Sequence, residues 1–333
     1  MSDILLNMQN VRVSFFTPAG EVKAVNDISF QLNEGDVIGI VGESGSGKSV
    51  TAYSIMGLLA SGGRVVGGAI DFNGHRINEM TENELRKIRG NEVSIIFQDP
   101  MTSLNPVYTI GNQICEVIVQ HTKKSYKEAM ARAEELLTLV GINEPRKRLK
   151  QYPHELSGGM RQRVMIAIAL ACEPKLLIAD EPTTALDVTI QAQILELMNE
   201  LKEKIGMSII MITHDLGIVA NMCQRIIVMY AGKIVEYGSV DDIFYNPQHE
   251  YTKGLLRSIP KLEDKEHKKL IPIEGTPVDM LNPPAGCPFA PRCESCMKIC
   301  LREMPEYTAV GDNHFSACWL IQKKQFERGG EVR

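Results

Sequence analysis

The stretch that most constrains this chain is GESGSGKS, residues 42–49, which fits the pattern G-x-x-x-x-G-K-[ST]. It follows the apolar run DVIGIV (36–41), and the residues from Ser49 to about Leu59 have the pattern of a helix. In such a strand–loop–helix context, backbone N–H groups of a glycine-rich turn surround phosphate oxygens, and the helix N-terminus favours the negative charge. The stretch predicts a nucleoside triphosphate site, with an ordinary glycine turn as the alternative.

Within this loop the residue types assign separate roles. Lys48 is expected to reach the β- and γ-phosphates, and the Ser49 hydroxyl is expected to bind Mg²⁺. The residues predicted to contact the nucleotide are Gly42, Glu43, Ser44, Gly45, Ser46, Gly47, Lys48, Ser49 and Val50.

Two further apolar runs indicate the fold class. KLLIAD (175–180) and MSIIMIT (207–213) are continuously apolar, as strands buried on both faces of a parallel sheet are. The residues between them predict a helix that stops at Gly206, and residues 123–142 predict another that ends near Gly141. Because strands and helices alternate, we expect an α/β core. NVRVSFF and AVNDISFQL predict two more strands.

Acidic and amide side chains follow two of the apolar runs. LLIADE (176–181) ends in Asp180, placed to hold Mg²⁺, and Glu181, placed to polarise an attacking water. Gln98, in IIFQDP, can bind Mg²⁺ or water. Phosphoryl transfer needs mainly positioning and charge stabilisation, which such groups supply. The alternatives are a helix cap or surface acid for the two carboxylates and a turn residue for Gln98.

Three other positions extend this set. In LSGGM (156–160), Ser157, Gly158 and Gly159 precede a helical pattern and offer a second phosphate-binding surface, or a plain helix cap. Asp187 lies seven residues after Asp180, and its alternative is also a helix cap. His214 follows the run MSIIMIT and could contact phosphate and the water of Glu181, or be structural.

Composition limits the class of protein. The chain has 333 residues, 44% of them apolar and 23% charged, which is typical of a folded soluble protein. A net charge of −5 without a basic arm argues against a nucleic-acid partner. The longest apolar run, VMIAIALAC (164–172), is half of the roughly 18–20 residues that span a membrane. The N-terminus has no signal-peptide pattern, so we expect a cytosolic chain with reduced thiols.

The motifs, in this order, resemble those of the ATP-binding-cassette (ABC) ATPases over roughly residues 4–255. The resemblance implies a P-loop NTPase fold with a mixed sheet core and a helical subdomain at about residues 99–172. Gln98 then matches the Q-loop, residues 156–160 the signature, Asp187 the D-loop and His214 the switch histidine. The signature of the family usually ends in Gln, and Met160 stands there instead.

The same resemblance implies a mechanism. Two cassettes face each other head to tail, and each ATP lies between the phosphate loop of one and the signature of the other. An aromatic residue packs on adenine, for which Phe15 matches best and Phe16 next, with a strand-core Phe as the alternative. The residues just after Gln98 are expected to receive a membrane partner. A chromosome or DNA-repair ATPase of this fold would carry a long insertion inside the cassette. A translation factor of this type would carry two cassettes in one chain. The sequence has neither feature. A metal or redox protein does not explain the first 255 residues.

Four segments near the end of the chain point to a narrower group: HEYTKGLLRSIP, EGTP, PPAGCPFAPRC and ACWL. They resemble the ATP-binding subunits of oligopeptide/dipeptide importers and their nickel-importing relatives. The resemblance implies a nucleotide-binding domain at 1–255, a C-terminal extension at 256–333, and a peripheral location on the cytoplasmic face of the membrane. The implied partners are a second, related ATPase subunit, two membrane permeases and an extracytoplasmic binding protein.

This extension is small, loop-rich and rich in cysteine. The resemblance implies a [4Fe–4S] cluster, as some members hold, on Cys287, Cys293, Cys300 and Cys318. The residues themselves fit an iron–sulfur cluster, Zn²⁺ or no metal, because four thiolates suit either group. Cys296 is an extra cysteine that forms C-x-x-C with Cys293. About 70 residues make little core of their own, so a metal would stabilise this segment.

Overall fold

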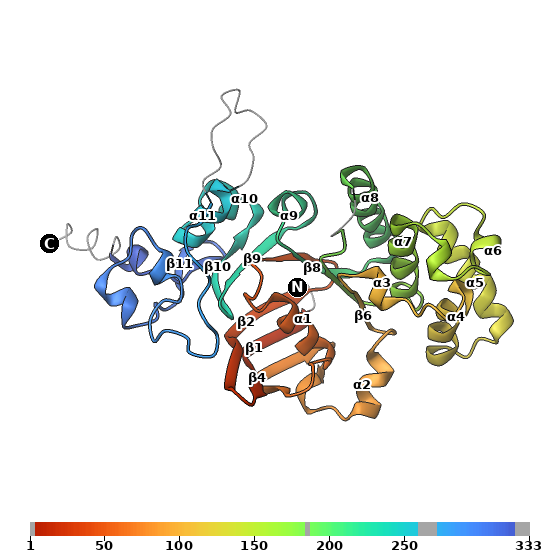
Figure 1. The fold of residues 1–333 in the computed structure, drawn as a ribbon, viewed down its shortest axis with the longest axis horizontal. Coiled ribbons are helices and arrows are strands. Elements are labelled where there is room, and N and C mark those ends of the chain that lie inside the picture. The colour runs from red at the N-terminus through yellow and green to blue at the C-terminus, as the bar shows by residue number, and fades with distance from the viewer. Residues whose placement is uncertain (1–3, 184–186, 259–271, 324–333) are drawn as a thin grey trace, which may run out of the picture. The chain divides into compact units, whose positions relative to one another are not determined.

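A computed structural model describes residues 4–183, 187–258 and 272–323 (Figure 1). The chain divides into two compact units. The first comprises Met1–Leu6, Leu32–Val37 and Phe72–Ile212, and the second comprises Asn7–Gln31, Ile38–Asp71 and Thr213–Arg333.

Three parallel strands form the core of the first unit. β7 (Leu176–Asp180) pairs with β6 (Val93–Ile96) on one side and with β8 (Ser208–Thr213) on the other. Every residue of β7 and β8 is buried. The prediction of two buried parallel strands is confirmed, since a strand covered on both faces is apolar at every position.

The helices of the first unit include both that the sequence predicts. A capping box between Ser125 and Glu128 sets the start of α5, and Gly206, with φ of +73°, ends α8. Among the described residues, no helix is long and apolar enough to cross a bilayer. The helices are α2 (Glu82–Ile88), α3 (Pro100–Ser103), α4 (Ile110–His121), α5 (Tyr126–Leu139), α6 (Pro145–Arg148), α7 (Gly158–Ala169) and α8 (Val188–Ile205), with the short strand β5 (His75–Arg76) before them and the 3-10 turns η1 (Ile77–Glu79) and η2 (Pro153–Glu155).

The second unit has a sheet that the C-terminal residues extend. β3 (Val37–Val41) runs parallel to β9 (Arg225–Tyr230), and β10 (Lys233–Ser239) is antiparallel to β9. β12 (His314–Ser316) then pairs with β10, and β11 (Thr308–Gly311) pairs with β12. The sequence predicts a loop-rich extension and misses these two strands, because three or four residues give no readable alternation.

The remaining elements lie mainly in the second unit. The predicted helix after the glycine-rich loop is α1, and it ends at Met56, about three residues before the expected end, because Gly57 adopts a left-handed conformation there. The predicted strands at NVRVSFF and AVNDISFQL lie within longer strands. The elements are β1 (Ile4–Thr17), β2 (Gly20–Asn33), α1 (Lys48–Met56), β4 (Gly63–Phe72), α9 (Leu216–Met222), α10 (Val240–Tyr245), α11 (Glu250–Arg257), η3 (Ala290–Arg292) and η4 (Lys298–Leu301).

A buried carboxylate joins the C-terminal strand to the rest of this unit. Glu236 on β10 has no exposed surface, and its oxygens accept hydrogen bonds from the backbone N–H groups of Gln248 (2.7 Å) and His249 (2.9 Å). Nε2 of His314, on β12, lies 2.9 Å from Glu236 Oε1. His249 in turn caps α11, because its Nδ1 accepts from the N–H of Tyr251. Burial lowers the pKa of His249 to about 4, so this cap is a neutral imidazole.

The predicted boundary at residues 255 and 256 falls inside α11. The charged run at residues 261–270 lies outside the described residues. The division into domains at 1–255 and 256–333 stays a prediction.

Candidate active site

The glycine-rich loop lies in the second unit, between β3 and α1. All five residues of β3 are buried, so the strand fixes the start of the loop. Gly42 has φ of +153°, and a Cβ atom there would lie 2.2 Å from the carbonyl oxygen of Met229. Gly47, at the start of α1, has φ of +97°, and its Cβ would lie 2.6 Å from the carbonyl oxygen of Ala24. Only glycine fits at these two positions.

The lysine of the loop is folded over the turn. Lys48 is 6% exposed, and its Nζ donates to the carbonyl oxygens of Gly42 (2.8 Å) and Glu43 (2.9 Å). The Oγ of Ser46 is buried and, within the described part of the chain, has no hydrogen-bond partner. A cationic Nζ and a buried hydroxyl inside a turn fit an anionic ligand such as a phosphate chain.

The outer side of the loop is held by residues that the sequence patterns do not identify. The backbone N–H of Glu43 donates to the Oη of Tyr251 (2.8 Å), a residue of α11. The Glu43 carboxylate pairs with Arg292, whose Nη1 and Nη2 lie 2.5 Å and 3.0 Å from its two oxygens. Arg292 stands next to Cys293 in PPAGCPFAPRC, so the cysteine-rich motif contains a residue that contacts the phosphate loop.

Three other residues predicted for the reaction, Asp180, Glu181 and Gln98, lie in the first unit. Asp180 ends β7 and is 1% exposed. Glu181 follows with φ of +47°, a conformation rarely adopted by non-glycine residues, and its N–H donates to the carbonyl oxygen of Ile212 (2.8 Å). Gln98 Nε2 donates to the Glu181 carboxylate (2.7 Å). The structure thus brings together two residues that the sequence predicts for the reaction.

The signature-like segment begins α7. Ser157 is the N-cap and accepts from the N–H of Met160, while Gly158 is the first residue of the helix and is exposed. A Cβ on Gly159 would lie 3.0 Å from Ile190 Cγ2. The exposed helix start suits a second anion-binding surface, and the same serine is also the helix cap that the alternative expected.

The structure also places four other predicted positions. Asp187 caps α8, accepting from Ile190 N–H (3.0 Å), and His214 is exposed just after β8. Phe15 packs on Gly63, and the ring of Phe16 lies under the guanidinium of Arg64, 4.1 Å from Cζ to the ring centre. Their roles toward nucleotide stay predictions.

The four predicted cysteine ligands line one cavity, together with Phe289 and other side chains. Cys287 and Cys300 are buried, and the N–H of Cys287 donates to the carbonyl oxygen of Cys300 (2.8 Å). Cys293 and Cys318 are half-buried, whereas Cys296 is exposed.

Burial favours the protonated thiol at three of the cysteines that line this cavity, Cys287, Cys293 and Cys318, by raising the pKa of each. Burial raises the pKa of Cys287 to about 12 and that of Cys293 to about 11, so a metal would have to displace these protons. Among the described residues, no three His, Cys, Asp or Glu side chains form a ready-made site for a single metal ion. The predicted [4Fe–4S] and zinc centres are thus not visible as a compact ligand group.

Comparisons with known proteins agree with these features. The family model described as "ABC transporter" matches residues 25–184, and the model described as "Oligopeptide/dipeptide transporter, C-terminal region" matches residues 235–300. The chain is 55% identical over 321 residues to a dipeptide transport ATP-binding protein, DppD, of Bacillus subtilis, covering 96% of each chain. It is also 55% identical over 304 residues to an oligopeptide transport ATP-binding protein, OppD, of Escherichia coli, covering 91% of this chain and 90% of that one.

Solved structures give the same picture for the cassette. The dimeric structure of a post-hydrolysis state of the ATP-binding cassette MJ0796, bound to ADP and Pi, matches with a TM-score of 0.64 and 28% identity. The match covers 71% of this chain and 98% of that chain. The cbiO1 protein of Clostridium perfringens, part of an ABC transporter complex, matches with a TM-score of 0.62 and 29% identity over 73% of this chain and 92% of that chain.

Proposed function

We propose that this chain, which belongs to the oligopeptide/dipeptide family of ABC transporter ATP-binding proteins, uses ATP binding and hydrolysis to drive the uptake of peptides through separate membrane subunits. One observation carries the proposal. The phosphate loop contains a buried lysine, Lys48, and within the same folded unit Glu43 of this loop pairs with Arg292 of the cysteine-rich segment that is typical of this family. A plain ATPase would need the loop and not the extension.

Different residues are proposed to bind the phosphates and to hold Mg²⁺. The N–H groups of residues 42–47 and the Lys48 ammonium would bind the phosphates, and the helix N-terminus at α1 favours their charge. Ser49, Gln98 and Asp180 are proposed to hold Mg²⁺, whose positive charge stabilises the transferring phosphoryl group. Because phosphoryl transfer needs little covalent help from the protein, positioning and electrostatics carry the catalysis.

Glu181 is proposed as the group that polarises the attacking water. Its carboxylate is held by the Gln98 amide (2.7 Å), so Gln98 can release Glu181 when a nucleotide and Mg²⁺ engage the amide instead. His214 is proposed to contact the γ-phosphate. Ser157, Gly158, Gly159 and Asp187 are proposed to act on the nucleotide of a facing cassette, because Ser157 and Gly158 leave the start of α7 exposed and Asp187 is itself exposed at the start of α8.

The proposed partners follow from this arrangement. A second ATPase subunit, related but not identical, would supply the other signature, and two permeases would carry the peptide across the membrane. An extracytoplasmic binding protein would deliver the peptide to the permeases. The chain would act on the cytoplasmic face of the membrane as a peripheral subunit.

A metal centre in the extension is a further part of the proposal, with [4Fe–4S] as the proposed group and Zn²⁺ as the alternative. Cys287, Cys293, Cys300 and Cys318 would hold it, and their placement around one cavity supports a shared group. Four thiolates suit either an iron–sulfur cluster or Zn²⁺. The absorption spectrum and the iron, sulfide and zinc content of protein purified without oxygen distinguish the two.

The test of the motor role uses the complex reconstituted in vesicles with its permeases. Glu181→Gln should keep nucleotide binding and stop both ATP turnover and peptide uptake, because it removes the carboxylate and keeps the shape of the side chain. Glu79→Gln, on an exposed surface of the first unit, is the control and should behave as the wild type. ATP hydrolysis near the wild-type rate in the Glu181→Gln complex would refute the role assigned to Glu181.

A further inference from the structure

We infer that Arg292 is a positioning residue for nucleotide binding. It holds the carboxylate of Glu43 away from the phosphate site and neutralises its charge, so the cysteine-rich extension sets the affinity of the phosphate loop. The inference rests on the proposed nucleotide site and concerns residues that no loop motif requires, since the second position of G-x-x-x-x-G-K-[ST] accepts any residue.

The Arg292–Glu43 pair has the geometry of a strong ion pair. Both guanidinium nitrogens Nη1 and Nη2 bind the carboxylate, at 2.5 Å and 3.0 Å, and the Arg292 side chain is 4% exposed against 29% for Glu43. Two-point binding fixes the plane of the carboxylate, which a lysine in place of Arg292 would not do. The carboxylate is therefore fixed in position as well as neutralised.

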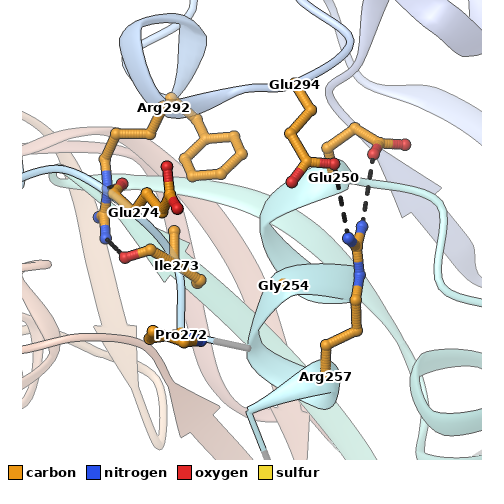
Figure 2. A pocket seen from close by; sticks show the side chains of 9 residues that line it. Glu250, Gly254, Arg257, Pro272, Ile273, Glu274, Arg292 and Glu294 are labelled. Atoms are coloured by element: carbon orange, nitrogen blue, oxygen red, sulfur yellow. Dashed lines mark hydrogen bonds and ion pairs between the residues drawn. The ribbon is translucent and has the colours of Figure 1, made fainter. Parts of the chain in front are cut away.

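Arg292 is itself held by groups that leave it little freedom. Its Nε donates to the carbonyl oxygen of Glu274 (2.9 Å) and its Nη2 to that of Ile273 (3.1 Å), the contact drawn in Figure 2. Nη1 also lies 3.3 Å from the Oη of Tyr230, at the end of β9. These hydrogen bonds hold the Arg292 guanidinium in one position.

The position of Glu43 explains why the pair matters for nucleotide. Glu43 is the second residue of the loop, and its own carbonyl oxygen accepts from Lys48 Nζ (2.9 Å). A free carboxylate at this place would repel the phosphates and compete for the same ammonium group. In the structure the carboxylate instead pairs with Arg292, which neutralises its charge beside the phosphate loop.

The experiment measures the Kd of a fluorescent ATP analogue with the purified full-length chain. Arg292→Gln should weaken binding at least about fivefold, the lower end of coupling between protein sites. The double variant Glu43→Gln/Arg292→Gln should return the Kd to within about twofold of the wild type. The repelling carboxylate is then gone, and the effects of substitutions at two contacting residues do not add. Arg257→Gln is the matched control, since Arg257 makes ion pairs to Glu250 and Glu294 on the same unit and is 43% exposed (Figure 2).

Each outcome decides the inference. An unchanged Kd in Arg292→Gln overturns it, and so does a loss that the double variant fails to recover, because that loss would come from damage to the extension. Thermal melting of the double variant, which lacks the same arginine, shows whether the fold survives. If wild type and Lys48→Ala bind the analogue equally poorly, the proposed nucleotide site itself fails, a result distinct from failure of the pair.

Discussion

At the scale of single residues, the phosphate loop shows which of its glycines are required by contact and which by backbone conformation. Gly42 and Gly45 both have positive φ, +153° and +76°. Of these two, Gly42 is the one where a methyl group would meet backbone, 2.2 Å from Met229 O, whereas nothing lies within 4 Å of a Cβ at Gly45. The two positions therefore form a matched pair for testing the loop.

Gly42→Ala should weaken binding of the ATP analogue about tenfold or more, because the loop must shift to admit the methyl group and strained backbone costs about 1–3 kcal/mol. Gly45→Ala should have a smaller effect, since it meets conformational strain without a clash. Titration of both purified variants, with thermal melting as the check on folding, makes the comparison. Equal losses in the two variants would contradict the assigned contact.

The cysteines give a second residue-scale prediction. If the extension holds the proposed metal centre, Cys300→Ser should lose most of that metal, because Cys300 is buried and lines the cavity with three other thiols. Cys296→Ser should keep the metal, because Cys296 is exposed and is not among the lining residues. Metal analysis of the two variants after purification without oxygen measures the difference, and equal losses would make Cys296 a ligand.

At the scale of elements, the sequence predicts those helices and strands that have a periodic or a continuously apolar pattern. β7 and β8 are continuous apolar runs, and α8 ends at a glycine, so their type and approximate place are readable. The sequence does not predict β12, because this strand has three residues and its hydrogen bonds depend on β10, about 80 residues earlier. The Gln98–Glu181 contact likewise joins residues 83 apart. Sequence motifs identify both residues but not their hydrogen bond.

The buried carboxylate of Glu236 adds a side-chain contact to His314 beside the backbone pairing of β10 with β12, so its removal is the test at this scale. Glu236→Ala should lower the free energy of unfolding by about 3–5 kcal/mol, the usual cost of breaking a buried charged network from one side. It leaves the N–H groups of Gln248 and His249 without their acceptor. Urea unfolding of the chain measures the change. Glu306→Gln, on an exposed residue, is the control, and a similar small effect in both would contradict the role of Glu236.

At the scale of the whole molecule, this ATPase has an extension that belongs to the same folded unit as its phosphate loop. Two of its contacts join the extension to the rest of this unit: the Arg292–Glu43 pair at the loop, and the pairing of β12 with β10. The sequence identifies the loop and the extension as motifs far apart along the chain. It could not predict that they touch, because Glu43 and Arg292 are 249 residues apart and neither is part of a pattern that names the other.

This connection predicts that the metal content of the extension affects nucleotide binding. Arg292 lies between Cys287 and Cys293, so the proposed metal would hold both ends of the segment that presents the guanidinium. Removing the metal by chelation, with loss confirmed by metal analysis, should weaken binding of the ATP analogue about fivefold, in the range of coupling between sites. By the reciprocity of linkage, bound nucleotide should raise the affinity of the extension for the metal by the same factor.

The double variant Glu43→Gln/Arg292→Gln separates this connection from general damage to the extension. It lacks the ion pair with or without metal, so chelation should leave its affinity for the ATP analogue unchanged. If chelation weakens nucleotide binding equally in the wild type and in the double variant, the metal acts on the loop through other contacts, such as Tyr251. If chelation changes neither, the metal stabilises the extension alone. The result that supports the connection is a loss in the wild type together with none in the double variant, because only the pair differs between the two chains.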